Sequence, residues 1–412
     1  MKMPEEGAAW AEVKENMIAR GENDAKWRDG KTAVYVFNAG PEVAEVQHEA
    51  YTLYMSENGL GPIAFPSLAQ MEQEVIQMAL SILHGPAEAT GAITSGGTDS
   101  ITMALKTARD FARAEKGLSA PANIVLPQSA HPAFDKAAHL MDIEVRRISL
   151  KADGSYEADP EAMGAACDNQ TIMMVGSAPN FPHGIIDPIG ALGEVAQAQD
   201  IWLHTDACVG GYFAPFARMN GVDVPPFDFE VPAVRSISAD LHKYGYAAKG
   251  ASTVLFRSQE LFKHMPFETR NWSGAPMTTP TLAGTRPGGA ISAAWAVMKV
   301  LGVEGYRQKQ GLVCETRKRA EIGVKALGFE VLGKPVLGLI AFRHPEHDNI
   351  AIYSEMYRRG WFTSITTQPP SLHLMLSPKH SEVINDYLSD LGECTQIVAA
   401  GKQGKKVEAR YN

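Results

Sequence analysis

Residues 233–257 read AVRSISADLHKYGYAAKGASTVLFR and place two lysines in a glycine-containing loop between two β-rich runs. The runs 233–239 and 252–257 predict strands, so Lys243 would follow the carboxyl end of the first strand. A lysine on a loop is usually solvated and inactive. At the mouth of a sheet, however, desolvation lowers the pKa of the amine and frees it to act as a covalent catalyst through a Schiff base.

Further β-rich runs precede this stretch, and helical patterns separate most of them. The runs lie at 123–127, 143–150, 171–177 and 201–207, with helical patterns at 131–141 and 188–199. Buried strands that alternate with helices predict an α/β fold with a mostly parallel sheet covered on both faces. From about residue 304 a long charged helix and shorter runs predict a small α+β domain. We therefore expect an N-terminal segment (1–60), a large domain (61–303) and a small C-terminal domain (304–412).

Composition limits the possible partners and the location of the protein. The 412 residues carry a net charge of −9, which argues against nucleic acid as a partner. The four cysteines are far apart, which favours a reducing compartment over a disulfide framework or a zinc site. The N-terminus has acidic residues where a signal peptide has its apolar core, and no run is long enough for a membrane span. We expect a cytoplasmic protein without a transmembrane anchor.

Four polar clusters fall on loops at strand ends, where ligands bind in open parallel sheets. Gly96 and Gly97 precede Thr98 and a helical pattern, which suits a phosphate or is an ordinary glycine turn. His131 opens a helix, where it could stack on a flat cofactor or merely be exposed. Asp206 ends an apolar strand, and a carboxylate there needs a cationic partner: an arginine, a metal or a protonated ring nitrogen. No HxxxH or carboxylate cluster accompanies Asp206, so a metal is disfavoured.

Taken together, these clusters match the needs of one cofactor. Pyridoxal 5'-phosphate requires a lysine for its aldehyde, an acid for its ring nitrogen and a helix N-terminus for its phosphate. Lys243, Asp206 and Gly97–Thr98 would supply these groups, with His131 as the stacking ring. The sequence therefore predicts a pyridoxal-phosphate enzyme.

The motifs also resemble a known family. The segments SISADLHKYGYAAKGAS, TSGGTDSI, LPQSAHPAFDKAA, VGSAPNFPHGIIDPI, HTDACVGGY and GTRPGGAISAAWAVM match the group II decarboxylases, which are fold-type I pyridoxal-phosphate enzymes with a transferase-like large domain. Within that family they are most similar to the sphingosine-phosphate lyase subfamily, because ordinary decarboxylases usually lack the YGYAxKG that follows His242-Lys243. The resemblance covers residues from about 30 to beyond 300, and it implies a homodimer with active sites at the interface.

The resemblance implies a role for each matching residue. Cofactor contacts would come from Lys243, Asp206, His131, Gly97, Thr98, His204 and Thr285. Catalytic work would fall to Lys243, Lys249, Tyr35 and His242, with His242 and His204 bordering the ring. Substrate contacts would come from Asn58, Lys249 and Arg286, and Thr285 and Arg286 could reach a phosphate across a dimer interface.

One departure bears on the reaction. The lyases carry a histidine that helps to bind the substrate phosphate, and Gly61 stands in its place here. Three functions stay open at this point. The first is cleavage of a phosphorylated amino alcohol, such as a sphingoid-base phosphate, to an aldehyde and an amino phosphate such as phosphoethanolamine. The second is decarboxylation of an amino acid, and the third is an inert homologue that only binds the cofactor.

Overall fold

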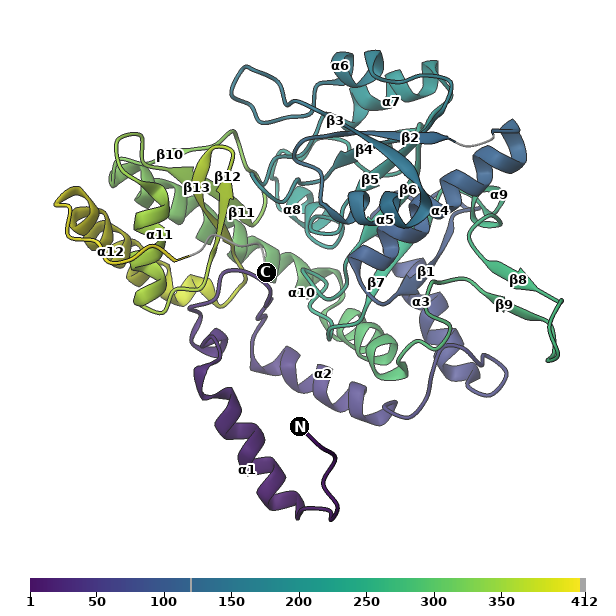
Figure 1. Ribbon diagram of the computed structural model, residues 1–412, viewed down its shortest axis with the longest axis horizontal. Helices are drawn as coiled ribbons and strands as arrows, with labels where there is room; N and C mark the ends of the chain where they lie inside the picture. The colour runs from purple at the N-terminus through teal and green to yellow at the C-terminus, as the bar shows by residue number, and fades with distance from the viewer. Residues whose placement is uncertain (119–120, 408–412) are drawn as a thin grey trace.

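The structure is a computed structural model that describes residues 1–118 and 121–407 (Figure 1). Three helices precede the main sheet: α1 (Trp10–Arg20), α2 (Pro41–Leu53) and α3 (Pro66–Ile82). Helix α1 has no buried residue, whereas α3 buries one side through Leu68, Val75 and Ile76. None of the helices in the described ranges is both long and apolar enough to cross a membrane.

A seven-stranded sheet forms the centre of the molecule. Its strands are β1 (Thr90–Thr94), β2 (Ala122–Pro127), β3 (Ile143–Ile148), β4 (Thr171–Ser177), β5 (Trp202–Asp206), β6 (Val234–Ala239) and β7 (Ser252–Phe256). The strand order is β1-β7-β6-β5-β4-β2-β3, and only β7 runs antiparallel to its neighbours. The predicted α/β class is confirmed. The sequence analysis missed β1, which is only five residues long and contains a glycine.

Helices cover both faces of the sheet, as predicted. They are α4 (Gly97–Lys116), α5 (Ala133–Met141), α6 (Pro160–Ala165), α7 (Ile189–Ala198), α8 (Ala214–Met219), α9 (Gln259–Phe262) and α10 (Gly288–Ala326). Successive strand residues point to opposite faces, so Ile124 packs in the cluster of α4 and α5 while Val125 packs in the cluster of α7 and α10. Both residues are fully buried, which explains the continuous apolar runs in the sequence.

The C-terminal part forms a second, antiparallel sheet. Its strands are β10 (Glu330–Val331), β11 (Leu339–Arg343), β12 (Ser364–Thr367) and β13 (Pro370–Met375), in the order β10-β11-β13-β12, with α11 (Asn349–Arg358) and α12 (His380–Ala399). Figure 1 shows these elements at one end of α10 and the main sheet beside its other half. The expected boundary at 303/304 falls inside α10, next to Gly302, whose φ of 53° interrupts the helix. The three-part division stays a prediction.

A short hairpin of β8 (Phe267–Thr269) and β9 (Met277–Thr279) projects beyond the main sheet (Figure 1). The carboxyl ends of β4, β5 and β6 meet at one edge of that sheet, because these strands are parallel neighbours. Strand β1 ends at the same edge and leads directly into the N-terminus of α4. The polar clusters found in the sequence therefore converge there.

Candidate active site

A cavity of about 570 Å³ opens at this edge of the sheet. A volume of this size suits a cofactor together with part of a substrate. Eight of the site residues predicted from the sequence line it: Tyr35, Gly97, Thr98, His131, Asp206, His242, Lys243 and Lys249. Four do not line it: Asn58, His204, Thr285 and Arg286.

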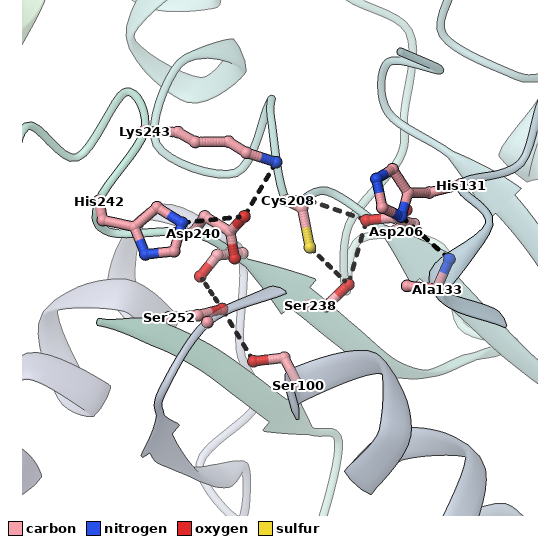
Figure 2. Close-up of polar contacts among 12 residues, drawn as sticks. Ser100, His131, Ala133, Asp206, Cys208, Ser238, Asp240, His242, Lys243 and Ser252 are labelled. Carbon is pink, nitrogen blue, oxygen red and sulfur yellow. Dashed lines mark hydrogen bonds and ion pairs between the residues drawn. The ribbon is translucent and has the colours of Figure 1, made fainter. Parts of the chain in front are cut away.

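Lys243 sits on the loop after β6, and its amine forms an ion pair inside the cavity. The Lys243 Nζ lies 2.9 Å from Oδ2 of Asp240, as Figure 2 shows. The loop is anchored in the core because Tyr244 donates its hydroxyl to the Leu376 carbonyl (2.6 Å) and Tyr246 donates to Gln310 Oε1 (2.9 Å). The lysine is therefore held in place by rigid aromatic neighbours rather than by a mobile surface loop.

The charge of Asp240 reverses the expected effect of burial on Lys243. Burial lowers the pKa of the Lys243 ammonium, but the adjacent Asp240 carboxylate outweighs it and raises the pKa above its ordinary value. Burial raises the pKa of Asp240, while the charge of Lys243 overcomes this and lowers it. The expectation of a depressed lysine pKa is therefore wrong for Lys243, because that expectation left out its partner. The sequence does contain this partner, because Asp240 lies three residues before Lys243.

Asp206 ends β5 with one oxygen engaged by the protein. Its Oδ1 accepts hydrogen bonds from the Cys208 N–H (3.1 Å) and from the Ser238 hydroxyl (3.2 Å). Within residues 1–118 and 121–407, Oδ2 has no hydrogen-bond partner, and Asp206 lines the cavity. A cationic N–H entering the cavity would therefore find a carboxylate oxygen ready to accept its hydrogen bond.

His131 lines the same cavity near Asp206 (Figure 2). Its Nδ1 accepts a hydrogen bond from the Ala133 N–H (3.1 Å), which fixes the ring and leaves the proton of the neutral form on Nε2. Burial lowers the pKa of His131, and the charge of Asp206 partly opposes this. A neutral, fixed imidazole is well suited to stack on a flat ring.

The N-terminus of α4 supplies a second wall. No side chain caps this helix end, so the first-turn N–H groups and the positive end of the dipole face the cavity at Gly97 and Thr98. A Cβ on Gly97 would lie 2.8 Å from Asp240 Oδ2, so glycine allows the helix to approach the lysine's partner. Asp99 turns back to accept from the N–H and hydroxyl of Ser95, at 3.0 Å each. This end of α4 can bind a phosphate.

Lys249 also lines the cavity, and its amine contacts backbone carbonyls where the amine of Lys243 contacts a carboxylate. Its Nζ donates to the carbonyls of Tyr35 (2.7 Å) and His242 (3.3 Å) and lies 5.5 Å from the Phe37 ring centre. Burial, together with the charge of Lys243, lowers the pKa of Lys249 to about 8. The side chain keeps some solvent-exposed surface. Its amine can thus gain or lose a proton near neutral pH.

Tyr35 and His242 flank this amine. Tyr35 has a left-handed φ of 61°, and burial raises the pKa of its phenol. His242 lies with Nε2 3.7 Å from Asp240 Oδ2, and burial lowers the pKa of the ring to about 4, so it is neutral at pH 7. Neither side chain therefore adds a charge to the cavity at neutral pH.

The residues outside the cavity fall into two groups. His204 is fully buried behind Asp206, where its ring contacts Ser236 and Ser238. Asn58 and Arg286 line a separate cavity of about 510 Å³, and Thr285 is exposed beside it. The structure does not bring these three residues to Lys243 within one chain. It adds Asp240, Cys208 and Ser238 to the site, which the sequence analysis did not single out.

Arg286 is already occupied by its own chain. Its guanidinium forms an ion pair with Glu72 and donates to the carbonyls of Ile93 (2.8 Å) and Gly59 (3.0 Å). Only 5% of the residue is exposed. In a single chain Arg286 therefore joins α3, β1 and the segment before α10, and it has no direct access to the cavity of Lys243.

The donor set of the cavity fits pyridoxal 5'-phosphate. Lys243 would hold its aldehyde carbon, Oδ2 of Asp206 would accept from its protonated ring nitrogen, and the uncapped end of α4 would bind its phosphate. His131 would cover one face of its ring. The free carboxylate oxygen and the uncapped helix end are the two features that call for such a ligand.

Comparison with known proteins gives the same class. Residues 4–345 match the model of the pyridoxal-dependent decarboxylase conserved domain, so the chain belongs to this family. The protein is accordingly a pyridoxal-phosphate-dependent enzyme of the lyase class.

Its relatives within the family include several lyases. The chain is 40% identical to the sphingosine-1-phosphate lyase of Oryza sativa over 386 residues, which cover 92% of this chain and 71% of the relative. The solved structure of the sphingosine-1-phosphate lyase from Burkholderia pseudomallei is 35% identical with a TM-score of 0.93, covering 98% of this chain and 94% of that one. A Lactobacillus brevis glutamate decarboxylase, 19% identical with a TM-score of 0.85 over 99% and 96% of the two chains, shares the fold.

Proposed function

We propose that this protein is a carbon–carbon lyase that cleaves a phosphorylated amino alcohol of the sphingoid-base phosphate type. The products are an aldehyde and an amino phosphate such as phosphoethanolamine. The observation that carries this proposal is the pair of lysines in one cavity, one held charged by Asp240 and one with a pKa of about 8. Similarity to sphingosine-1-phosphate lyases over nearly the whole chain supports the same reaction.

The cleavage needs two proton transfers, and each lysine suits one of them. When bound, pyridoxal 5'-phosphate supplies an aldehyde for the substrate amine and a protonated ring that accepts the electrons of the broken bond. Lys249 takes the proton of the substrate hydroxyl, so that the O–H and C–C bonds break as the C=O bond of the aldehyde forms. Its pKa near the operating pH suits a base. Lys243, which stores a proton against Asp240, then protonates the carbon that remains attached to the amine.

Other residues hold the reacting groups in position. Asp206 keeps the ring nitrogen protonated through Oδ2, and the neutral His131 excludes water from one face of the ring. Gly97 and Thr98 hold the cofactor phosphate at the end of α4. Tyr35 and His242 fix the Lys249 amine through their backbone carbonyls.

An amino-acid decarboxylase is the second candidate. Gly61 replaces a phosphate-binding histidine of the lyases, and Asn58 and Arg286 lie outside the Lys243 cavity within one chain, so a substrate phosphate has fewer partners there. A product assay on the cofactor-loaded enzyme separates the two. Phosphorylated sphingoid bases should yield a long-chain aldehyde and phosphoethanolamine in equal amounts, whereas release of carbon dioxide from aromatic or acidic amino acids would favour the decarboxylase.

A homodimer with shared active sites is part of the proposal. Asn58 and Arg286 line the second cavity, Thr285 and Gly61 are close to them in the sequence, and in a dimer the exposed Thr285 would serve the partner's cavity. Mixed dimers test this directly. Lys243→Ala and Thr285→Ala chains, each impaired alone, should regain activity when unfolded together and refolded. Thr285 is exposed, so its replacement leaves the fold intact. Activity no higher than the sum of the two separate variants would place Thr285 outside the partner's site.

We also propose a cytoplasmic location and a three-part division of the chain. Four free cysteines suit a reducing, cytoplasmic compartment. Limited proteolysis should cut near residues 60 and 303 before it cuts the main sheet, if the segments 1–60, 61–303 and 304–412 behave as units.

A further inference from the structure

A line of buried polar side chains runs behind Asp206 across two strands. Trp202, His204 and Asp206 alternate along β5 and so face the same side of the sheet. Strand pairing sets His204 opposite Ser236 and Asp206 opposite Ser238 on β6. Apart from Asp206, whose exposed fraction is 6%, all of these residues are at least 99% buried.

Hydrogen bonds join these side chains end to end. The Trp202 Nε1–H donates to Ser236 Oγ (2.8 Å), and Ser236 Oγ lies 2.8 Å from His204 Nδ1. His204 Nε2 lies 3.2 Å from Ser238 Oγ, and Ser238 donates to Asp206 Oδ1 at 3.2 Å. Figure 2 shows the last link, together with the Cys208 thiol that donates to Ser238 (3.3 Å).

The two ends of the line fix the direction of every donor between them. The Trp202 indole can only donate, so Ser236 accepts from it and turns its own hydrogen toward His204 Nδ1. At the other end the Asp206 carboxylate can only accept, so Ser238 donates to it and must accept from His204 Nε2–H. His204 is thus held as the neutral tautomer with its proton on Nε2.

Burial supports the neutral form of this ring. It lowers the pKa of His204 to about 4, and the charge of Asp206 opposes the shift only in part. In this tautomer His204 accepts at Nδ1 and donates from Nε2, so the hydrogen bonds from Trp202 to Ser238 all point in the same direction. Hydrogen bonds that point the same way in a dry interior strengthen one another.

We propose that Trp202, Ser236, His204 and Ser238 form a one-directional relay that donates to Oδ1 of Asp206 and so holds its Oδ2 toward the cofactor ring nitrogen. Oδ1 accepts hydrogen bonds from Ser238, the last residue of the relay, and from the Cys208 N–H, which leaves Oδ2 for the ligand. His204 is then a positioning residue that acts through Ser238 and touches neither cofactor nor substrate. This inference rests on the cofactor alone, so it stands whichever of the two proposed substrates is correct.

The tautomer can be measured without any reaction. In the cofactor-free full chain labelled with ¹⁵N-histidine, long-range ¹H–¹⁵N spectra should show His204 neutral, protonated on Nε2 and unchanged from pH 6 to 9. The signal is assigned by its loss in His204→Gln. In Ser236→Ala the Nδ1 partner is gone, but Ser238 still accepts from Nε2–H, so the Nε2–H tautomer should persist. An imidazolium at pH 7, or an Nδ1–H tautomer in the unmodified protein, would overturn the relay.

Cofactor binding provides the second test. Ser238→Ala should weaken binding of pyridoxal phosphate about tenfold, since a donor to a charged group is lost. Binding of 1-deazapyridoxal phosphate, which has a C–H in place of the ring nitrogen, should change less than about twofold because it makes no use of the Asp206 charge. Ser236→Ala should show the same selectivity with a smaller loss.

A matched control separates the relay from packing. Ser354 is 1% exposed and donates its hydroxyl to the Ile350 carbonyl (2.7 Å) in the C-terminal part of the chain, so Ser354→Ala removes a buried serine hydroxyl without touching Asp206. It should leave both affinities unchanged. Equal losses for the two compounds in Ser238→Ala and Ser236→Ala would mean that the serines only support packing, and the relay would be rejected.

Discussion

The cavity around Lys243 and the cavity around Arg286 differ in how their charged groups are satisfied. Around Lys243, one oxygen of the Asp206 carboxylate has no hydrogen-bond partner among residues 1–118 and 121–407, and no side-chain cap is found at the end of α4 in the same ranges. Around Arg286, the guanidinium is already paired with Glu72 and two backbone carbonyls. Within one chain the cavity of Lys243 therefore holds the groups proposed for the cofactor except Thr285, together with Lys249. Of the other residues expected to bind substrate, Arg286 is already paired with groups of its own chain.

The difference shows why matching a motif does not place a residue in a site. GTRPGG was expected to reach a phosphate across a dimer interface, and within one chain Arg286 and the lysines of HKYGYAAKG line different cavities. Taking a buried guanidinium away from its carboxylate is costly, so Arg286 will stay with Glu72 in its own chain. The predictions below test whether the two cavities have the separate roles that this contrast implies.

The largest effect is expected at Lys243. Lys243→Ala should lower turnover about a thousandfold or more, because the amine that holds the cofactor and returns the proton is gone. Steady-state kinetics on the cofactor-loaded enzyme measures the loss. Borohydride treatment of the unmodified enzyme should attach the cofactor to a peptide containing Lys243. Attachment at Lys249 would reverse the roles of the two lysines.

The same substitution should also destabilise the cofactor-free protein. Asp240 would remain buried without its partner, at a cost of about 3 kcal/mol. The pKa of the unpaired carboxyl would then lie above its unfolded value, so the loss is greatest at neutral pH and shrinks as the pH falls through that pKa. Thermal melts from pH 5 to 8 test whether the loss of stability becomes smaller as the pH falls. Asp240→Asn together with Lys243→Ala should recover much of the stability but no activity.

A smaller but still severe loss is expected at Asp206. Asp206→Ala removes the charge that keeps the ring nitrogen protonated, so turnover should fall about a hundredfold or more while cofactor affinity falls less. Absorbance titration gives the affinity, and turnover is then measured at saturating cofactor. Near-normal turnover in this variant would show that the ring nitrogen lies elsewhere in the cavity.

The fold was largely predictable because the strands are buried on both faces. The run 171–177 predicted β4 with its observed ends, and the helical patterns at 131–141 and 188–199 predicted α5 and α7 within two residues. Strand β1 was not predicted because its partner β7 is 158 residues away in the sequence, counting from Thr94 to Ser252, and because its five residues include Gly91 and Ala92, which are depleted in strands. Long-range pairing leaves no local pattern to detect.

The site was predictable where a polar residue ends a parallel strand. Asp206 ends β5 and Lys243 lies on the loop after β6, so strand direction places both at one edge of the sheet. Asp240 and Ser238 were missed although both lie within the quoted stretch, because their importance depends on what they face in space. His204 was assigned to the cofactor, but alternation along β5 puts it behind Asp206. The rotation of a side chain relative to the cavity is a tertiary property.

Lys249 should show an intermediate effect that depends on pH. Lys249→Ala should lower kcat/KM for phosphorylated substrates about a hundredfold, with normal cofactor loading, since the base that takes the proton of the substrate hydroxyl is lost. In the unmodified enzyme kcat should rise through pH 8 as the amine loses its proton and becomes a base. Lys249→Arg stays protonated and should lack this rise. Unchanged processing of phosphorylated substrates by Lys249→Ala would favour the decarboxylase.

The smallest effect is expected at Gly61, and it tests the second cavity. A Cβ there would lie no closer than 3.6 Å to its nearest neighbour, Ala64 Cβ, and Gly61 is not among the residues with left-handed φ. A side chain is therefore tolerated, and thermal melts should show little change. If this surface serves the partner's cavity, Gly61→His should lower KM for a phosphorylated sphingoid base about threefold to tenfold, as one added donor to a phosphate would. Gly61→Leu, of similar bulk but without a donor, should leave KM unchanged. Equal KM values for Gly61→His and Gly61→Leu would show that the second cavity does not contribute to substrate binding.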